Sequence, residues 1–339
     1  MITDSLRSAL ARLVSERLGA EWTLAELTES DGHAGLTFLF QVTHPAGDSR
    51  RYVLKLPPAG VARRGNTDVY RQAPLLRALQ AGGLPVPGVP FAEAGEDTPF
   101  GLPYIVMDCL PGRTFFVWDP HPDYARTPEV AGPLWRQAVE VLPRFHRFDW
   151  RTGLAGWQSP EPLAEQVTRW RRIYQQAPEP GWAAQAEAVE ALLLETLPQG
   201  SPIGLYHGDY QPGNILYANG QLTGVIDWEI SGIGDVLLDI GWLMMAADQH
   251  NWVDAWRAVC PPPVEELRDL YEAGMGQSFA AIPWYQAFAG FRLGSIGCLN
   301  VKLHRKGQRH DPIWESIGLC LSSMFERARE LLEARRSGR

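Results

Sequence analysis

The pattern of apolar and polar residues predicts that the N-terminal part of the chain is small and rich in strands. Apolar side chains at helical spacing run from Leu6 to Leu18, and Gly19 ends this first helix. Thr3 or Asp4 can cap its start. Short segments with the length and composition of strands follow, with one helical stretch among them: 22–27, 36–43, 51–56 and 104–107 as strands and 69–81 as the helix.

Beyond residue 112 the spacing of apolar residues becomes that of longer helices. These are predicted over 135–148, 162–176, 185–197, 239–247, 264–279, 284–303 and 311–336. Two short apolar runs, 214–217 and 222–226, interrupt them and flank Asn219-Gly220. Asn-Gly between two such runs is the strongest short-range signal for a hairpin. We therefore expect an α+β protein of two lobes, a small one over residues 1–108 and a larger, mostly helical one after residue 112.

Composition and charge restrict the class of protein. A chain of 339 residues with 45% hydrophobic and 21% charged residues is typical of a soluble globular protein with more than one core. The net charge of −8 argues against a nucleic-acid binder and could favour the binding of a cationic small molecule. The sequence has no signal pattern, no apolar run long enough for a membrane span, and four widely spaced cysteines typical of reduced thiols. We expect a cytoplasmic monomer or homodimer with no nucleic-acid or membrane partner.

The residues with the clearest chemistry flank the predicted hairpin. They lie in His207-Gly208-Asp209-Tyr210-Gln211-Pro212-Gly213-Asn214, here called the catalytic loop, and in Val225-Ile226-Asp227-Trp228-Glu229. Asp209 can accept a proton from an attacking hydroxyl group. Asn214 can hold a metal ion, and Asp227 can bridge metal and phosphates. A rigid hairpin would fix Asn214 and Asp227 at the same end, as a Mg–nucleotide phosphoryl-transfer site requires.

The pattern HGDxxxxNIL followed by IDWE resembles the aminoglycoside phosphotransferase-like small-molecule kinases, distant relatives of the protein kinases. Other segments extend the resemblance over nearly the whole chain, most closely to the subgroup associated with acyl-CoA dehydrogenases: 53–55, 104–112, 145–150, 153–156 and 166–170. The resemblance implies a bilobal protein-kinase-like fold with a hinge at 109–112 and the acceptor pocket in residues 113–339. It implies ATP-dependent transfer of a phosphoryl group to a hydroxyl of a small molecule, with Mg²⁺ as cofactor. The subgroup favours a hydroxyacyl or similar metabolite as acceptor.

The resemblance also implies which residues bind the nucleotide. Lys55, at the end of an alternating strand, would contact the α- and β-phosphates. Gly32 and His33 lie in a segment similar to the turn that covers the nucleotide, where glycines allow close approach of the backbone to phosphates. The carbonyl of Asp108 and the amide of Leu110 would meet the adenine.

The partner of the lysine departs from the family pattern. Related kinases usually supply a glutamate from the next helix, where this chain has Gln72. Gln72 could hold Lys55 as a neutral partner, Asp68 could substitute, or Lys55 could be positioned only when nucleotide binds. His207 is expected to stabilise the catalytic loop by hydrogen bonding, and Asp239 is expected to tie that loop to the next helix.

Basic and acidic residues outside the motif are candidates for the acceptor pocket. Arg169 and Arg172 lie on a predicted helix, either as a solvated face or as an anion-binding wall suited to a carboxylate or to the phosphates of a CoA ester. Arg292 is a further basic candidate, for which a solvated surface position is favoured. Glu229 is either a surface acid or a group beside the metal.

Two other functions compete with that of an active metabolite kinase. A pseudokinase that binds nucleotide without turnover is favoured by the altered lysine partner and opposed by the intact Asp209, Asn214 and Asp227. An aminoglycoside-modifying phosphotransferase would need an acidic acceptor pocket. A protein kinase is disfavoured, because no recognisable activation segment follows Asp227.

Overall fold

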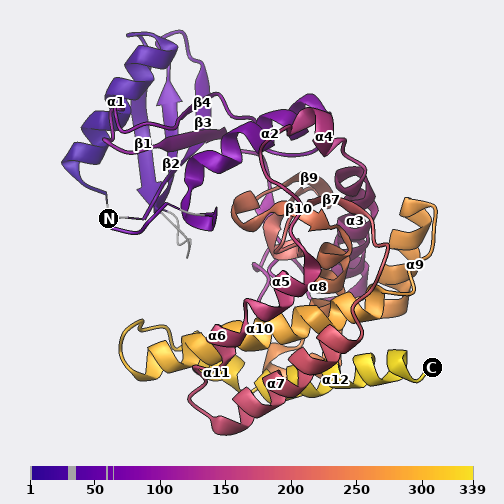
Figure 1. The fold of residues 1–339 in the computed structure, drawn as a ribbon. Coiled ribbons are helices and arrows are strands. Elements are labelled where there is room, and N and C mark those ends of the chain that lie inside the picture. The colour runs from indigo at the N-terminus through magenta and orange to yellow at the C-terminus, as the bar shows by residue number, and fades with distance from the viewer. Residues whose placement is uncertain (1, 30–35, 59, 64, 339) are drawn as a thin grey trace. The chain divides into compact units, whose positions relative to one another are not determined.

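The computed structural model describes residues 2–29, 36–58, 60–63 and 65–338 (Figure 1). The chain divides into two compact units. The first contains Met1–Gly112 together with two returning segments, Arg151–Leu154 and Thr223–Ile230. The second contains Arg113–Trp150, Ala155–Leu222 and Ser231–Arg339. The first unit is built on a sheet and the second is mainly helical, so the mixed α+β class predicted from the sequence is confirmed.

A five-stranded antiparallel sheet in the order β1-β2-β3-β5-β4 forms the first unit. Its strands are β1 (Thr23–Glu29), β2 (Leu36–Thr43), β3 (Ser49–Leu56), β4 (Phe91–Glu93) and β5 (Tyr104–Asp108). β3 is the central strand, and within it Lys55 pairs with Thr37 of β2 and Ile105 of β5. Pairing on both sides fixes the backbone from which the lysine side chain projects.

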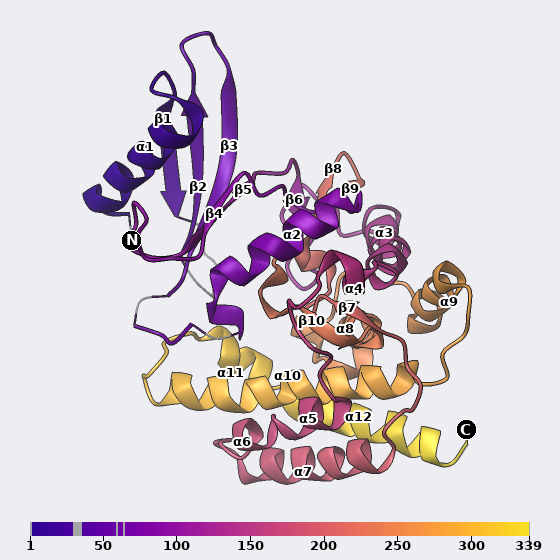
Figure 2. The same ribbon diagram turned by 45° about the horizontal axis from the view of Figure 1, so that its top comes forward.

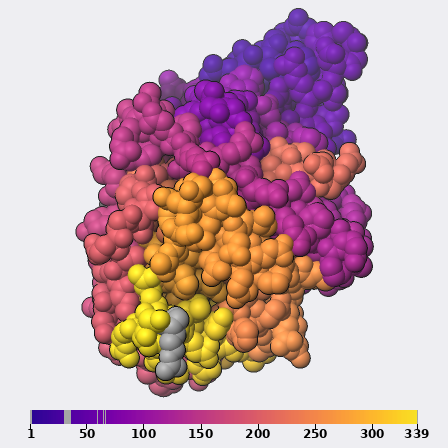
Figure 3. Space-filling model, turned by 90° about the vertical axis from the view of Figure 1, so that its right-hand side faces the viewer, coloured from indigo at the N-terminus to yellow at the C-terminus, as the bar shows by residue number. Residues whose placement is uncertain are grey.

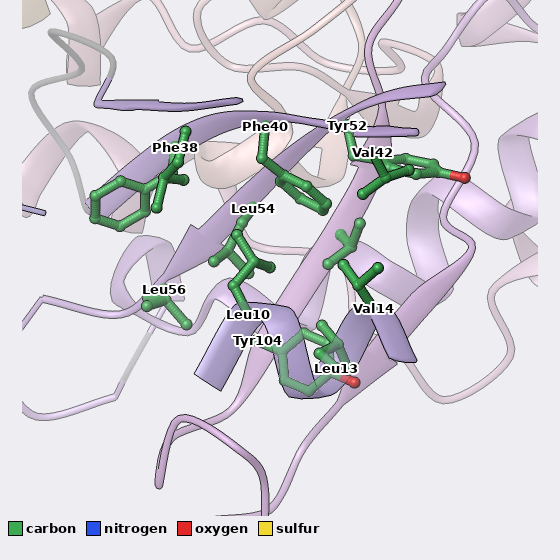
Figure 4. Packing of buried hydrophobic residues seen from close by; sticks show 12 residues of the cluster. Leu10, Leu13, Val14, Phe38, Phe40, Val42, Tyr52, Leu54, Leu56 and Tyr104 are labelled. Atoms are coloured by element: carbon green, nitrogen blue, oxygen red, sulfur yellow. The ribbon is translucent and has the colours of Figure 1, made fainter. Parts of the chain in front are cut away.

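Helix α1 (Asp4–Leu18) covers one face of this sheet (Figure 2). Thr3 accepts a hydrogen bond from the Leu6 N–H at 3.1 Å, which makes it the N-cap, and Gly19 ends the helix with a φ of 112°. Leu10 and Leu13 of the helix pack on Leu54 of the sheet, as Figure 4 shows. The sequence therefore predicted both the helix and its buried face correctly.

The second half of the first unit holds helix α2 (Gln72–Ala81), which follows a single 3₁₀ turn at Val69–Arg71. Its buried apolar side chains are Ala73, Leu75, Leu76 and Leu79. The short helix α4 (Trp150–Gly153) contributes its last residues to this unit.

Helix α10 is the centre of the second unit, where it packs against α6, α7, α8, α11 and α12 (Figures 1 and 2). The helices of this unit are α3 (Pro128–His146), α5 (Leu163–Thr168), α6 (Arg171–Tyr174), α7 (Pro180–Glu195), α8 (Leu237–Ala247), α9 (Val264–Met275), α10 (Ile282–Arg305), α11 (Ile313–Gly318) and α12 (Leu321–Arg336). The C-terminal end of α12, coloured yellow, lies at the surface in the view of Figure 3. Among the described residues no helix has the length and apolar character that a membrane span needs.

Two small antiparallel sheets position the motif residues. β7 (Ile203–Tyr206) pairs with β10 (Gly232–Asp235), and β8 (Ile215–Ala218) lies between β6 (Arg113–Thr114) and β9 (Gln221–Val225). The turn between β8 and β9 has a φ of 52° at Asn219 and 74° at Gly220. Asn and Gly are the residues that tolerate two successive positive φ angles, and the hairpin predicted from them is confirmed.

Two predicted helices are broken in the structure. The stretch 162–176 divides into α5 and α6, because the Trp170 N–H donates to the carbonyl of Val167, three residues back, at 3.3 Å. The stretch 311–336 divides into α11 and α12. α11 ends at Gly318, where a Cβ would lie 3.3 Å from Val301 of α10. The helical pattern of apolar residues encodes neither break.

Candidate active site

The catalytic loop begins directly after β7 and is organised around the carboxylate of Asp209. The side-chain amide of Asn214 donates to the Asp209 backbone carbonyl and to its Oδ2, both at 2.8 Å. Gln211 Nε2 donates to the other carboxylate oxygen at 3.1 Å. The structure therefore brings Asp209 and Asn214 together and fixes the orientation of a half-buried carboxylate.

Asp239 of α8 holds the start of the catalytic loop through hydrogen bonds to its backbone. It is 1% exposed and accepts hydrogen bonds from the backbone N–H groups of His207, at 2.7 Å, and Gly208, at 2.8 Å. Its Oδ2 also lies 3.2 Å from Nε2 of the buried His146. The His207 ring accepts from the Asp209 N–H at 3.3 Å. A buried carboxylate thus satisfies two backbone donors that would otherwise have no partner.

Lys55 is held within the first unit by two acids of the 225–229 segment. Its Nζ donates to Asp227 Oδ1 at 2.8 Å and lies 3.7 Å from Glu229 Oε2. Its side chain is 16% exposed. Burial works against the charged amine, but the charges of Asp227 and Glu229 outweigh it and raise the pKa of Lys55 above its ordinary value.

Neither Gln72 nor Asp68 takes the place of the missing glutamate. The ion pairs of Lys55 in the described part of the chain are with Asp227 and Glu229 alone. Gln72 is 2% exposed, and its Nε2 is buried without a hydrogen-bond partner among the described residues. Glu229, two positions after Asp227, is the acid that the sequence pattern alone could not assign to the lysine.

The turn at Asp227 has an unusual backbone conformation. Its φ is 65°, in the left-handed region, which Asp tolerates better than most non-glycine residues. The next residue, Trp228, is buried and its indole N–H donates to the carbonyl of Val225 at 3.0 Å. The buried tryptophan holds the turn closed, and the turn leaves the Asp227 carboxylate partly exposed beside Lys55.

The structure describes only some of the other residues that are predicted to contact the nucleotide. Gly32 and His33 lie outside the described residues. Asp108 ends β5, and its N–H donates to the carbonyl of Gly88 at 2.9 Å. Burial raises the pKa of the Asp108 carboxyl. Leu110 packs so closely on Gly224 that a Cβ there would lie 2.2 Å from Leu110 Cδ1.

The basic candidates of the second unit have different surroundings. Arg169 forms an ion pair with Glu161, and Arg172 is exposed. Arg292, for which a solvated position was favoured, instead has a buried Nε and a guanidinium stacked on tryptophan rings. Arg292 is thus half-buried and not fully solvated, because other helices bring to it aromatic residues that the helical pattern does not reveal.

Asn214 of the second unit and Asp227 of the first are the residues that could hold a metal ion. No group of three His, Cys, Asp or Glu side chains converges among the residues that the structure describes. Mg²⁺ needs only one or two carboxylates and completes its coordination with phosphate oxygens and water. Because the Asn214 amide nitrogen makes both bonds to Asp209, its Oδ1 is available to a cation. Asp227 supplies a partly exposed carboxylate.

Known proteins match this chain both in sequence and in fold. A sequence profile described as "Phosphotransferase enzyme family" matches residues 30–285. Acyl-CoA dehydrogenase family member 11 of Gallus gallus is 31% identical over 286 residues, which cover 79% of this chain and 35% of that protein. The chain spans about a third of the length of the curated relatives it matches.

Two solved structures illustrate the likeness in fold. A candidate aminoglycoside phosphotransferase from Ralstonia eutropha superposes with a TM-score of 0.77 at 20% identity, over 96% of this chain and 98% of the other. A complex of the aminoglycoside phosphotransferase APH(4)-Ia with ADP and hygromycin B gives a TM-score of 0.62 at 16% identity, over 95% and 98% of the two chains.

Proposed function

The chain belongs to the phosphotransferase enzyme family, and from that premise we propose that it transfers the terminal phosphoryl group of ATP to a hydroxyl group of a small molecule. The fold expected from the sequence, the protein-kinase-like fold of aminoglycoside phosphotransferases, is confirmed by the solved structures it matches. We also propose a role for each residue of the site and a class of acceptor.

The observation that carries the proposal is the double hydrogen bond from Asn214 to Asp209 in a loop anchored by Asp239. It holds the Asp209 carboxylate in one orientation, ready to accept a hydrogen bond from the acceptor hydroxyl. As the hydroxyl oxygen bonds to the terminal phosphorus, the bond from phosphorus to the bridging oxygen breaks and ADP leaves. Asp209 takes the hydroxyl proton late in this step.

The remaining residues position and neutralise the phosphates. Lys55 would donate to the α- and β-phosphate oxygens, to which it would turn from Asp227 and Glu229. Asn214 and Asp227 would hold Mg²⁺, which when bound neutralises charge on the phosphates. Catalysis of this kind is mainly positioning and electrostatic stabilisation.

A hydroxyacyl or similar metabolite is the acceptor we favour. The support is the 31% identity with acyl-CoA dehydrogenase family member 11, a protein whose name refers to acyl-CoA chemistry. The competing pseudokinase function rested on the missing glutamate partner of Lys55. The two carboxylates that do hold the lysine favour an active enzyme over a silent one.

A phosphoryl-transfer assay over a panel of hydroxylated compounds tests the proposal. We expect wild-type protein to phosphorylate at least one hydroxy acid or hydroxyacyl ester, and Asp209→Asn to lower the rate by at least about 10²-fold. Asp254→Asn is the matched control, since the Asp254 side chain is 91% exposed and forms an ion pair with Arg257. Equal rates for wild type and Asp209→Asn would remove the proposed base. Thermal stabilisation by nucleotide without product from any acceptor would instead support the pseudokinase.

A further inference from the structure

Arg292 is a half-buried positive charge that forms no ion pair with the residues that the structure describes. It lies on α10 with its guanidinium over the faces of two indole rings, 4.6 Å from the centroid of Trp242 and 5.6 Å from that of Trp170. Its Nε is buried and donates to no group that the structure describes. None of the ion pairs found over residues 2–29, 36–58, 60–63 and 65–338 includes it.

This arrangement is unfavourable for the protein alone. A guanidinium stays protonated under all ordinary conditions and offers five donors. Removing part of such a group from water costs free energy unless an anion or hydrogen-bond acceptors replace the lost water, and stacking on tryptophan offsets only part of that cost. A charge that is half-buried, stacked on indole rings and without an ion pair is therefore organised to receive an anion from solution.

The charge lies within electrostatic reach of the catalytic loop. Burial lowers the pKa of Arg292, the charges of Asp209 and Asp239 oppose that shift, and the positive charge of Arg169 adds to it. Arg169 itself lies in the break between α5 and α6, next to Trp170, the ring on which Arg292 stacks. Two arginines thus contribute positive potential near the carboxylate proposed to activate the acceptor hydroxyl.

Aromatic side chains connect this arginine with the catalytic loop. Phe116 lies beside Gly213, where a Cβ would be 3.4 Å from its ring. Phe116 contacts Trp118 with ring centroids 5.2 Å apart, and Trp118 contacts Trp252 at 4.9 Å. Trp252 and Trp242 share one apolar cluster. These rings offer apolar contacts, and the buried indole N–H groups of Trp118 and Trp252 have no described acceptor.

We propose that Arg292, assisted by Arg169, binds an anionic group of the acceptor, so that the acceptor is a hydroxylated organic anion with an apolar skeleton. Its hydroxyl group lies at Asp209 and its anionic group at Arg292. The anion is a carboxylate or a phosphate of a CoA ester, and a polycationic aminoglycoside is disfavoured. The assignment of the hydroxyl to Asp209 rests on the function proposed above.

Calorimetric binding without nucleotide tests the anion site separately from turnover. The probes are a straight-chain hydroxy acid, its methyl ester and its CoA thioester. Wild type is expected to bind the acid or the thioester at least about tenfold more tightly than the methyl ester, as a charge-assisted hydrogen bond would give. A preference for the acid identifies a carboxylate, and a preference for the thioester identifies the CoA phosphates.

Arg292→Met is the decisive variant, because a thioether side chain packs well between two indole rings. It is expected to lose the preference for the anionic probe, whereas Arg292→Lys keeps part of it, since a lysine retains the charge but not the planar fork. Arg305→Met makes the same change on the same helix, at an arginine already paired with Glu179 and Glu315, and should retain the wild-type preference.

Thermal unfolding distinguishes binding from a structural role of the stacked arginine. Arg292→Met is expected to melt no lower than wild type, because it removes a half-buried charge that has no ion pair in the described part of the chain. A lower melting temperature with the anion preference intact would show a structural clamp and overturn the proposal. It is also overturned if wild type binds acid, thioester and ester equally, or binds none of them. Anion binding that depends on Arg292 without any phosphoryl transfer would contradict the proposed function alone.

Discussion

Lys55 and Asp227 form an ion pair of 2.8 Å within the first unit, between the central strand of its sheet and the turn that follows β9. The lysine that the family resemblance assigns to the phosphates is therefore held by the acid assigned to the metal. Glu229 adds a second carboxylate at 3.7 Å. The chain keeps a largely buried lysine charged and oriented without the glutamate that related kinases place in the next helix.

The two acids should contribute unequally to nucleotide use. Glu229→Gln leaves the shorter ion pair to Asp227 in place, so we expect less than about a tenfold loss in kcat/KM for ATP. Asp227→Asn removes both the ion pair and the proposed metal ligand, and should lower kcat/KM for ATP by at least about 10²-fold. Steady-state kinetics with varied ATP measures both. A loss from Glu229→Gln as large as that from Asp227→Asn would make Glu229 the principal partner of the lysine.

Asp239→Asn should weaken the catalytic loop. An asparagine offers one acceptor oxygen where Asp239 uses two, so a backbone donor of His207 or Gly208 loses its partner. We expect a loss of about 1–3 kcal/mol in the free energy of unfolding, measured by urea denaturation, together with a fall in kcat. The control is Asp269→Asn, at an exposed aspartate that pairs with Arg268. A variant as stable as wild type would show that the loop does not depend on Asp239.

Gln72→Met should stabilise the protein. The glutamine is buried in α2 with its Nε2 unpartnered in the described part of the chain, and methionine fills a similar volume without a donor to satisfy. We expect a gain of about 1 kcal/mol in the free energy of unfolding by urea denaturation. Gln72→Glu, which restores the glutamate of related kinases, should instead destabilise, since Lys55 already has its carboxylates. If Gln72→Met is destabilising, the amide has a partner such as a buried water.

Local signals explain which parts of this structure were predictable from sequence. The first helix follows from Thr3 and Gly19, and the hairpin from Asn219-Gly220, because capping and positive φ angles depend on a few adjacent residues. The pairing of Lys55 with Glu229 joins distant segments, and no pattern around either residue encodes it. The lobe boundaries and the monomer-or-homodimer state stay predictions.

The surroundings of Arg292 and the helix break at Trp170 also depend on distant segments and not on adjacent residues. Both are on segments with ordinary helical spacing, and both owe their environment to the packing of α10 against α6 and α8. A basic residue on a helix is usually solvated, so sequence alone favours the surface. Only the tertiary contacts reveal that indole rings cover part of the Arg292 side chain.

Asp248 should make the second unit sensitive to acid. Its side chain is 3% exposed, follows α8, and accepts hydrogen bonds from Arg327 Nε of α12 and Gln286 Nε2 of α10, both at 2.8 Å. Burial opposes its charged form, but the hydrogen bonds from Arg327 and His250 outweigh burial and lower the pKa of Asp248 below its ordinary value. A carboxyl with a lowered pKa in the folded state stabilises the protein above its unfolded pKa, and this contribution is lost as the pH falls through the folded value.

Urea unfolding of wild type and Asp248→Asn as a function of pH tests this contribution. At neutral pH the variant should be less stable, because Arg327 loses a buried ionic partner. The difference in unfolding free energy should shrink as the pH falls below about 4, where the unfolded carboxyl is protonated. Asp254→Asn, at an exposed aspartate, should follow the wild-type curve throughout. A difference between wild type and Asp248→Asn that stays constant down to acid unfolding would mean that the Asp248 charge adds nothing, and that the variant is weakened by packing alone.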